Sequence, residues 1–205
     1  MVQTSIVHPL IVRLGHWVNA IAMPVMILSG WRIYNASPLF HFRFPDGITL
    51  GGWLGGALQW HFAAMWLLAI NGLIYVLYGV LTGYYRHRFF PLHIDAILCE
   101  LAQLMHGRIS HMLGTYNRIQ KLAYLVVILL AITLVLSGLA MWKPVQLQEL
   151  ASLMGGYEGA RVVHFVAMAG VSIFIVIHIT MVILVPRTLL PMFTGRLPHH
   201  HVAGN

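Results

Sequence analysis

The stretch VVHFVAMAGVSIFIVIHITMVILVP, residues 162–186, decides the fold of this chain. It contains no Asp, Glu, Lys or Arg in 25 positions, which is long enough for a helix to cross the hydrocarbon core of a bilayer. Two histidines, His164 and His178, lie in it fourteen residues apart. On a helix, this spacing separates them by about 21 Å along the axis and by roughly 40° around it. We therefore predict a membrane span with one imidazole near each end, both on the same face.

The composition of the whole chain is that of an integral membrane protein. Hydrophobic residues make up 59% of its 205 residues and charged residues only 8%, whereas soluble domains carry about 25% charged residues. The net charge of +7 is better explained by membrane topology than by nucleic-acid binding, because no separate domain carries a basic face. The single cysteine, Cys99, excludes an intrachain disulfide, and without a CxxCH motif there is no covalent c-type haem.

Three further apolar stretches are expected to span the membrane, at about residues 10–34, 59–84 and 120–142. Residues 92–113 contain Asp95, Glu100 and Arg108, so we predict that they form a helix on the membrane surface. The predicted fold is all-α: a four-helix transmembrane bundle over residues 1–190, with a cytoplasmic surface helix between spans two and three. Residues 191–205 are predicted to be a loose cytoplasmic tail.

The distribution of basic residues predicts the orientation of these spans. Four spans put both termini on one side, and eight of the twelve Lys and Arg residues fall on that side. These are Arg13, Arg86, Arg88, Arg108, Arg118, Lys121, Arg187 and Arg196, against Arg32, Arg43, Lys143 and Arg161 on the other side. Since basic residues concentrate in cytoplasmic loops, we predict that both termini are cytoplasmic.

With this orientation, four histidines fall at two depths. His61 opens the second span on the outer side and matches His164, while His16 opens the first span on the cytoplasmic side and matches His178. Imidazoles are costly in hydrocarbon, and two pairs at two depths suit two haems, each with two axial histidines. A single histidine of this kind can instead hydrogen-bond a neighbouring helix. A zinc site is the main metal alternative, but it needs closer clustering, usually with carboxylate or thiolate ligands.

Small residues near these histidines have two interpretations. They let helices approach a flat porphyrin, or they let helices pack against each other, as small residues do in membranes generally. They are Gly15, Ser29, Gly30, Gly72, Ser137, Gly138, Gly170 and Ser172.

The ordered motifs resemble those of the bacterial di-haem cytochromes b561, which include the membrane cytochrome b subunits of nickel–iron hydrogenases and formate dehydrogenases. The resemblance covers about residues 8–190. It rests on RLGHWVNA and LSGWRIYNA in the first span, LGGWLGGALQWHFAAMW at the second, TYNRIQKLAYL at the third, and the His164/His178 pair. The GGWLGG segment particularly resembles the subgroup found beside periplasmic molybdopterin oxidoreductases.

This resemblance implies electron exchange across the bacterial inner membrane, between a quinone and an outside partner, through two b-type haems. It places the quinone near the cytoplasmic haem, around Tyr116, Asn117, Gln120 and Lys121. The alternative for Asn117 and Gln120 is helix capping at the membrane boundary. Arg13, Arg118 and Arg161 are candidates for binding haem propionates, and contact with lipid headgroups is the alternative for each.

The chain itself encodes no molybdenum site or iron–sulfur relay, so we expect an electron-transfer subunit of a quinone-linked oxidoreductase complex. Its expected partners are membrane lipid, quinone and a periplasmic molybdopterin enzyme or hydrogenase-like subunit, which would dock on residues 35–58 and 143–160. One alternative is a stand-alone superoxide oxidase, for which Arg43, Lys143 and Arg161 would supply an outer cationic funnel. Another is a haem-storage or sensing protein without turnover.

Overall fold

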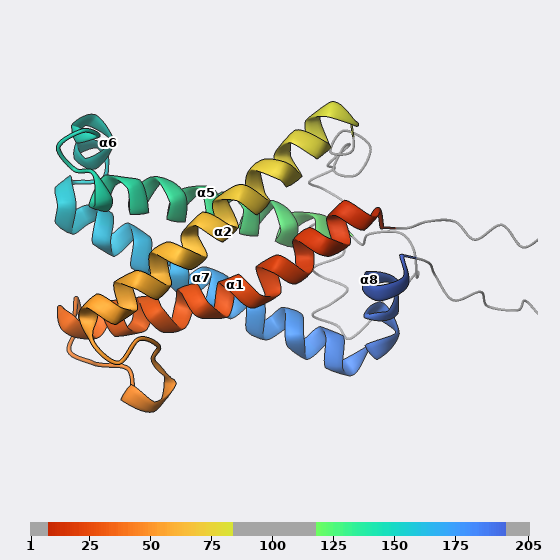
Figure 1. The fold of residues 1–205 in the computed structure, drawn as a ribbon, viewed down its shortest axis with the longest axis horizontal. Coiled ribbons are helices and arrows are strands. Elements are labelled where there is room, and N and C mark those ends of the chain that lie inside the picture. The colour runs from red at the N-terminus through yellow and green to blue at the C-terminus, as the bar shows by residue number, and fades with distance from the viewer. Residues whose placement is uncertain (1–7, 84–117, 196–205) are drawn as a thin grey trace, which may run out of the picture. The chain divides into compact units, whose positions relative to one another are not determined.

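The computed structural model describes residues 8–83 and 118–195, with only the backbone described at 118–121. Every regular element in these two ranges is a helix (Figure 1). The elements are α1 (Leu10–Ala36), η1 (Asp46–Ile48), α2 (Leu54–Leu81), α5 (Arg118–Trp142), α6 (Gln148–Leu153), α7 (Gly156–Leu184), η2 (Pro186–Thr188) and α8 (Leu190–Thr194). The all-α prediction is confirmed. The surface helix predicted at 92–113 lies outside the described residues.

Four of these helices are long and apolar enough to cross a membrane, as predicted: α1, α2, α7 and the segment Leu122–Trp142 of α5. Two of them begin earlier than the apolar stretches suggest. Helix α7 starts at Gly156 and not near residue 162, because Glu158 and Arg161 pair on adjacent turns (Nη1 to Oε2, 2.7 Å). A charged first turn can therefore extend the helix beyond the hydrocarbon.

Helix α2 also begins early, at Leu54, so that Gly55 and Gly56 are helical and not part of a loop. The turn is made just before them by Gly51 and Gly52, which have φ angles of 108° and 68°. A Cβ on Gly51 would lie 2.4 Å from the backbone of Ala57, and one on Gly56 would lie 2.3 Å from the Gly51 carbonyl. The GGWLGG segment thus folds its turn tightly onto the first turn of α2.

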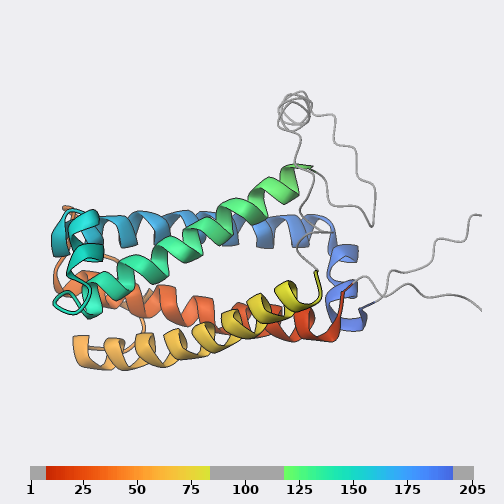
Figure 2. The ribbon, with the colours of Figure 1, turned by 90° about the horizontal axis from the view of Figure 1, so that it is seen from above.

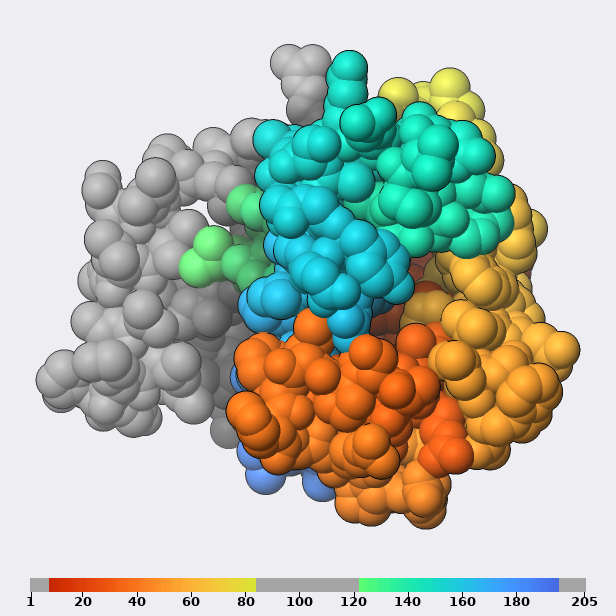
Figure 3. Space-filling model, turned by 90° about the vertical axis from the view of Figure 1, so that its left-hand side faces the viewer, coloured from red at the N-terminus to blue at the C-terminus, as the bar shows by residue number. Residues whose placement is uncertain are grey.

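The chain forms two compact units, residues 1–88 with 182–205, and residues 89–181. In the first unit, α1 and α2 pack against each other (Figures 1 and 2). The loop between them forms a lobe at one end of this pair, drawn in orange in Figure 3. In the second unit, α5 packs on α6, and the buried alanines Ala140, Ala151 and Ala160 form a small core with α7. Small side chains allow these helices to approach closely.

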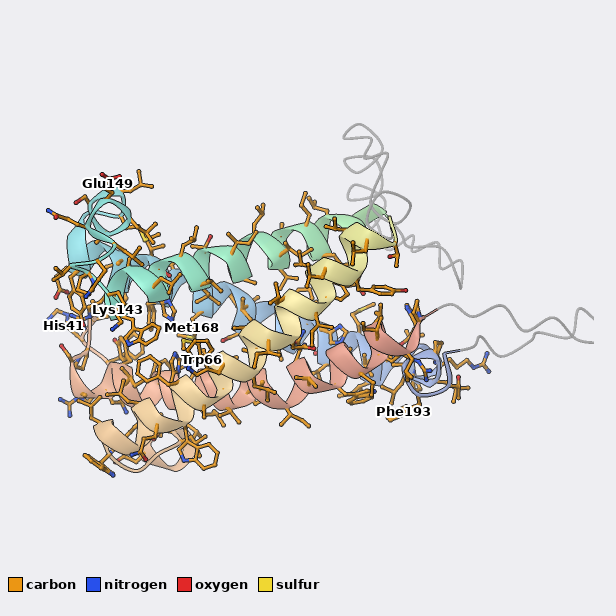
Figure 4. The ribbon with its side chains drawn as sticks, turned by 45° about the horizontal axis from the view of Figure 1, so that its top comes forward. His41, Trp66, Lys143, Glu149, Met168 and Phe193 are labelled. Carbon is orange, nitrogen blue, oxygen red and sulfur yellow. The ribbon has the colours of Figure 1, made fainter. Side chains whose placement is uncertain are left out.

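The segment after Pro191, expected to be loose, begins with helix α8, which packs on α1 (Figure 4, where Phe193 is labelled). Trp17 donates from its indole nitrogen to the Met192 carbonyl at 3.4 Å, and its ring lies 4.7 Å from that of Phe193. Arg13 donates to the Phe193 carbonyl. The short helix is held because its carbonyls receive donors from the first turns of α1.

Candidate functional site

His61 on α2 packs against a serine–glycine pair on α1. Its Nδ1 lies 3.1 Å from Oγ of Ser29, which is fully buried. A Cβ added to Gly30 would lie 3.5 Å from Cε1 of His61, an ordinary van der Waals distance. Ser29 and Gly30, two of the small residues singled out in the sequence, therefore contact the predicted ligand itself.

The same arrangement recurs in the second unit, between α5 and His164 on α7. Nδ1 of His164 lies 2.9 Å from Oγ of Ser137, which is also fully buried. A Cβ on Gly138 would lie 3.5 Å from Cε1 of His164. Both histidines thus face a Ser-Gly pair on the preceding long helix.

His16 on α1 lies beside a polar contact that was not predicted from the sequence. Asn71 on α2 donates from Nδ2 to the Gly15 carbonyl at 2.9 Å and to Oδ1 of Asn19 at 2.7 Å. The His16 ring meets that of Trp17 edge-on, with centroids 5.5 Å apart. The sequence does hold a clue to this contact: Asn19 and Asn71 both lie within apolar spans, and an amide inside a membrane needs a hydrogen-bond partner.

His178 lies on α7 and is half-buried. Its ring stacks on that of Phe174, one turn earlier, with centroids 5.9 Å apart and planes at 12°. Helix α7 is continuous from Gly156 to Leu184, so the fourteen residues from His164 to His178 are all helical, as predicted.

Each unit by itself presents two histidines with the same axial separation. On α7, His164 and His178 are fourteen residues apart, about 21 Å. On α1, His16 is also fourteen residues from Gly30, the residue that contacts His61. His16 and His61 are therefore separated by about 21 Å along the helix pair as well. Each unit thus has two of the predicted ligand histidines at two levels along its helices.

These side chains fit the axial ligation of haem. A ligand histidine binds iron through one ring nitrogen while the other is held by an acceptor, and Nδ1 of both His61 and His164 meets a serine oxygen. Among the described residues, no three His, Cys, Asp or Glu side chains gather as a metal-ion cluster. Histidines at two separate depths suit two flat cofactors with two axial ligands each.

The predicted propionate and quinone residues are described unevenly. Arg161 pairs with Glu158, and Arg13 donates to the Phe193 carbonyl. Arg118, Gln120 and Lys121 lie in the first turn of α5, where the backbone alone is described, and Asn117 lies outside the described residues.

Comparison with known proteins shows the family of this chain. The model of the prokaryotic cytochrome b561 family matches residues 7–195. A relative from Azospira oryzae, named as the protein-methionine-sulfoxide reductase subunit YedZ1, is 52% identical over 190 residues, which cover 92% of this chain and 96% of the relative. A nickel–iron hydrogenase B-type cytochrome subunit of Cupriavidus necator is 22% identical over 196 residues, covering 87% and 78%. Both of these names are provisional.

No solved structure matches significantly. The chain therefore belongs to the prokaryotic cytochrome b561 family of membrane electron-transfer proteins that carry haem b.

Proposed function

We propose that this chain transfers electrons between the quinone pool of the bacterial inner membrane and a periplasmic redox enzyme, by way of two b-type haems. The proposed axial pairs are His61 with His164, and His16 with His178. The observation that carries the proposal is the common spacing, since each unit presents its two histidines about 21 Å apart along the helices. When bound, haem supplies reversible one-electron exchange.

The proposed orientation puts His61 and His164 on the periplasmic side and both termini in the cytoplasm. The two-to-one excess of Lys and Arg on the side of the termini supports it. Trp142 and Lys143 mark the end of α5 as a membrane boundary, where the Lys143 ammonium lies 5.1 Å from the Trp142 ring centroid (Lys143 is labelled in Figure 4). Such amphipathic residues are typical of a membrane boundary.

The register of α5 against α7 supports a quinone site at the cytoplasmic end. Ser137 contacts His164, and a Cβ on Gly170 would lie 3.0 Å from Leu130, so the two helices run antiparallel. Continuing this register brings the level of His178 to about residue 123 of α5. Gln120 and Lys121 then lie about one turn beyond that level, roughly 5 Å along the axis. A carboxamide and an ammonium there supply donors for a quinone carbonyl.

The proposed partner is a periplasmic protein-methionine-sulfoxide reductase. The support is the 52% identical relative, which is named as a subunit of such an enzyme and aligns over 96% of its own length. The overall reaction balances: a quinol releases two electrons and two protons. A methionine sulfoxide takes up two electrons and two protons, giving methionine and water. The catalytic chemistry belongs to the partner, and this chain supplies the electrons.

The loop between α1 and α2 offers a preformed surface for that partner. Asn35 holds it by donating to the Phe44 carbonyl at 2.8 Å and accepting from the Phe44 amide at 2.9 Å. The Phe44 ring stacks on Trp31 at 4.5 Å. Arg32, paired with Asp46, and the exposed Arg43 line an open hollow in this lobe. Docking on a rigid loop beside His61 would keep electron transfer short.

The test uses the purified full chain with haem in lipid nanodiscs. A quinol is expected to reduce both haems. Addition of a purified periplasmic protein-methionine-sulfoxide reductase is expected to reoxidise them only when methionine sulfoxide is present. The His164→Ala variant is the matched control and should lose this reoxidation. Haems that no quinol reduces would overturn the proposed function.

The same preparation separates the superoxide-oxidase alternative. That alternative requires superoxide to reduce the haems rapidly without any partner. It also requires that the sulfoxide reductase does not reoxidise them. One of the three cations expected to form its funnel, Arg161, is neutralised by Glu158 in this structure.

A further inference from the structure

The two predicted outer ligands, His61 and His164, share a hydrogen-bonded partner of the same kind. Each lies against the sequence Leu-Ser-Gly, at residues 28–30 on α1 and 136–138 on α5. Ser29 and Ser137 are both 0% exposed. Two helix pairs that differ elsewhere in sequence therefore repeat one local contact at the same proposed haem.

The position of the serine proton decides how each contact works. Oγ of Ser29 lies 2.6 Å from the Val25 carbonyl, and Oγ of Ser137 lies 2.6 Å from the Thr133 carbonyl. A carbonyl can only accept, so each hydroxyl hydrogen is used in this bond to its own helix. The serine oxygen then accepts a hydrogen bond from the histidine. Nδ1 of each histidine then carries the proton, and the lone pair of the neutral ring lies on Nε2, the nitrogen that would bind iron.

The environment strengthens this assignment. A hydroxyl that already donates is a better acceptor, and in a low-dielectric interior both bonds gain strength. The neighbouring Gly30 and Gly138 bring the helix backbone against the ring edge, at 3.5 Å from each Cε1 to a Cβ placed there. Each ring thus meets a serine oxygen on one side and a glycine on its edge. An acceptor on Nδ1–H raises the basicity of the coordinating nitrogen.

We propose that Ser29 and Ser137 are a matched pair of positioning residues for the outer haem. They hold His61 and His164 in the ligating tautomer and ring orientation, and through Nδ1 they lower the reduction potential of that haem. The inference rests on the proposed function, in which His61 and His164 ligate one haem. It adds that both ligands of this haem are tuned by the same device, from Ser29 on α1 and from Ser137 on α5.

The test replaces each serine in the haem-loaded full chain: Ser29→Ala, Ser137→Ala and the double variant. Ser172→Ala is the matched control, because Ser172 also donates to a carbonyl four residues earlier, that of Met168, at 2.9 Å. Ser137→Thr retains the hydroxyl and is the rescue variant, since threonine makes the same bond to its own helix. The measurements are haem content, an optical redox titration, and the electron paramagnetic resonance spectrum of the oxidised haems.

The potential of one haem is expected to shift upwards in each alanine variant and further in the double variant, with its resonance signal altered. This haem should be the one missing from His164→Ala. The other haem should keep its original potential in every serine variant. In Ser172→Ala and Ser137→Thr, both haems should keep their original potentials and resonance signals. Because the Met26 backbone also hydrogen-bonds His61, a shifted potential is expected for Ser29→Ala, and not complete haem loss.

Two results would overturn the inference, and they are distinguishable. Unchanged potentials and spectra in the double variant, with two haems present, would remove the role of the serines and leave the proposed function standing. Retention of both haems in His164→Ala would remove the ligand pairing itself.

Discussion

Asn71 on α2 donates a 2.9 Å hydrogen bond to the backbone carbonyl of Gly15 on α1, one residue before the predicted haem ligand His16. The same nitrogen donates to Asn19 at 2.7 Å. A Cβ on Gly15 would lie 3.2 Å from Oδ1 of Asn71, so the close approach of the two helices depends on this glycine. The α1–α2 pair is therefore joined by a polar contact at the depth of His16.

Replacing Asn71 by leucine should destabilise this pair. Interhelical hydrogen bonds in membranes contribute about 0.6 to 2 kcal/mol, and leucine removes both of those made by Asn71. The free energy of unfolding in mixed detergent micelles measures the loss. Leu73→Ala, at a side chain that is 60% exposed, is the control and should change stability by no more than about 0.5 kcal/mol. Equal stability of Asn71→Leu and the unmodified chain would show that the contact is unimportant.

Enlarging Gly30 or Gly138 should expel the outer haem. The first added carbon already lies at contact distance from the histidine ring, 3.5 Å from Cε1, so the branches of valine must displace that ring. We expect Gly30→Val and Gly138→Val to bind one haem per chain. Gly72→Val is the matched control, since nothing lies within 4 Å of its added Cβ, and it should retain two haems. Two haems in Gly30→Val would contradict the described packing around His61.

Truncating Phe193 should loosen α8 without affecting the haems. The ring contact with Trp17, at 4.7 Å, is the type of aromatic pair that contributes about 0.5 to 1.5 kcal/mol. Hydrogen exchange of the backbone amides at 190 and 192–194 is expected to accelerate in Phe193→Ala, while exchange in α2 stays unchanged. Unaltered protection of α8 would mean that its hydrogen bonds to Arg13 and Trp17 hold it in place without the ring contact.

The charges of Glu158 and Arg161 should act in opposite directions on the haem for which His164 is the proposed ligand. A positive charge near a haem favours the reduced iron, which carries one positive charge less. Arg161→Gln is therefore expected to lower the potential of that haem and Glu158→Gln to raise it, as followed by optical redox titration. Stability should change by less than about 1 kcal/mol, because the carboxylate is 70% exposed. Shifts of the same sign in both variants would argue against an electrostatic effect.

The parts of the fold that follow from composition and helix geometry could be predicted from the sequence. The four spans and the spacing of His164 and His178 depend only on apolar length and a rise of about 1.5 Å per residue. The beginnings of α2 and α7 could not be predicted from apolar length, because the helices start with residues such as Gly55 and Glu158 that lie outside the apolar stretches. They are helical here through the turn at Gly51 and the ion pair with Arg161.

The contacts of the site were harder to predict than its ligands. Ser29 and Ser137 stood out as small residues, but their hydrogen bonds to histidine depend on how two helices pack, which the sequence does not reveal. Arg13 was predicted to meet a propionate or a lipid headgroup. Its contact with Phe193 depends on the return of the chain after α7.

Haem content of the four histidine variants tests the central claim most directly. Each of His16→Ala, His61→Ala, His164→Ala and His178→Ala is purified as the full chain and titrated optically. We predict two haems in the unmodified chain and one in each variant. His61→Ala and His164→Ala should lose the same haem, and His16→Ala and His178→Ala the other. Two haems in any of these variants, or loss of the same haem in His61→Ala and His178→Ala, would contradict the proposed pairing.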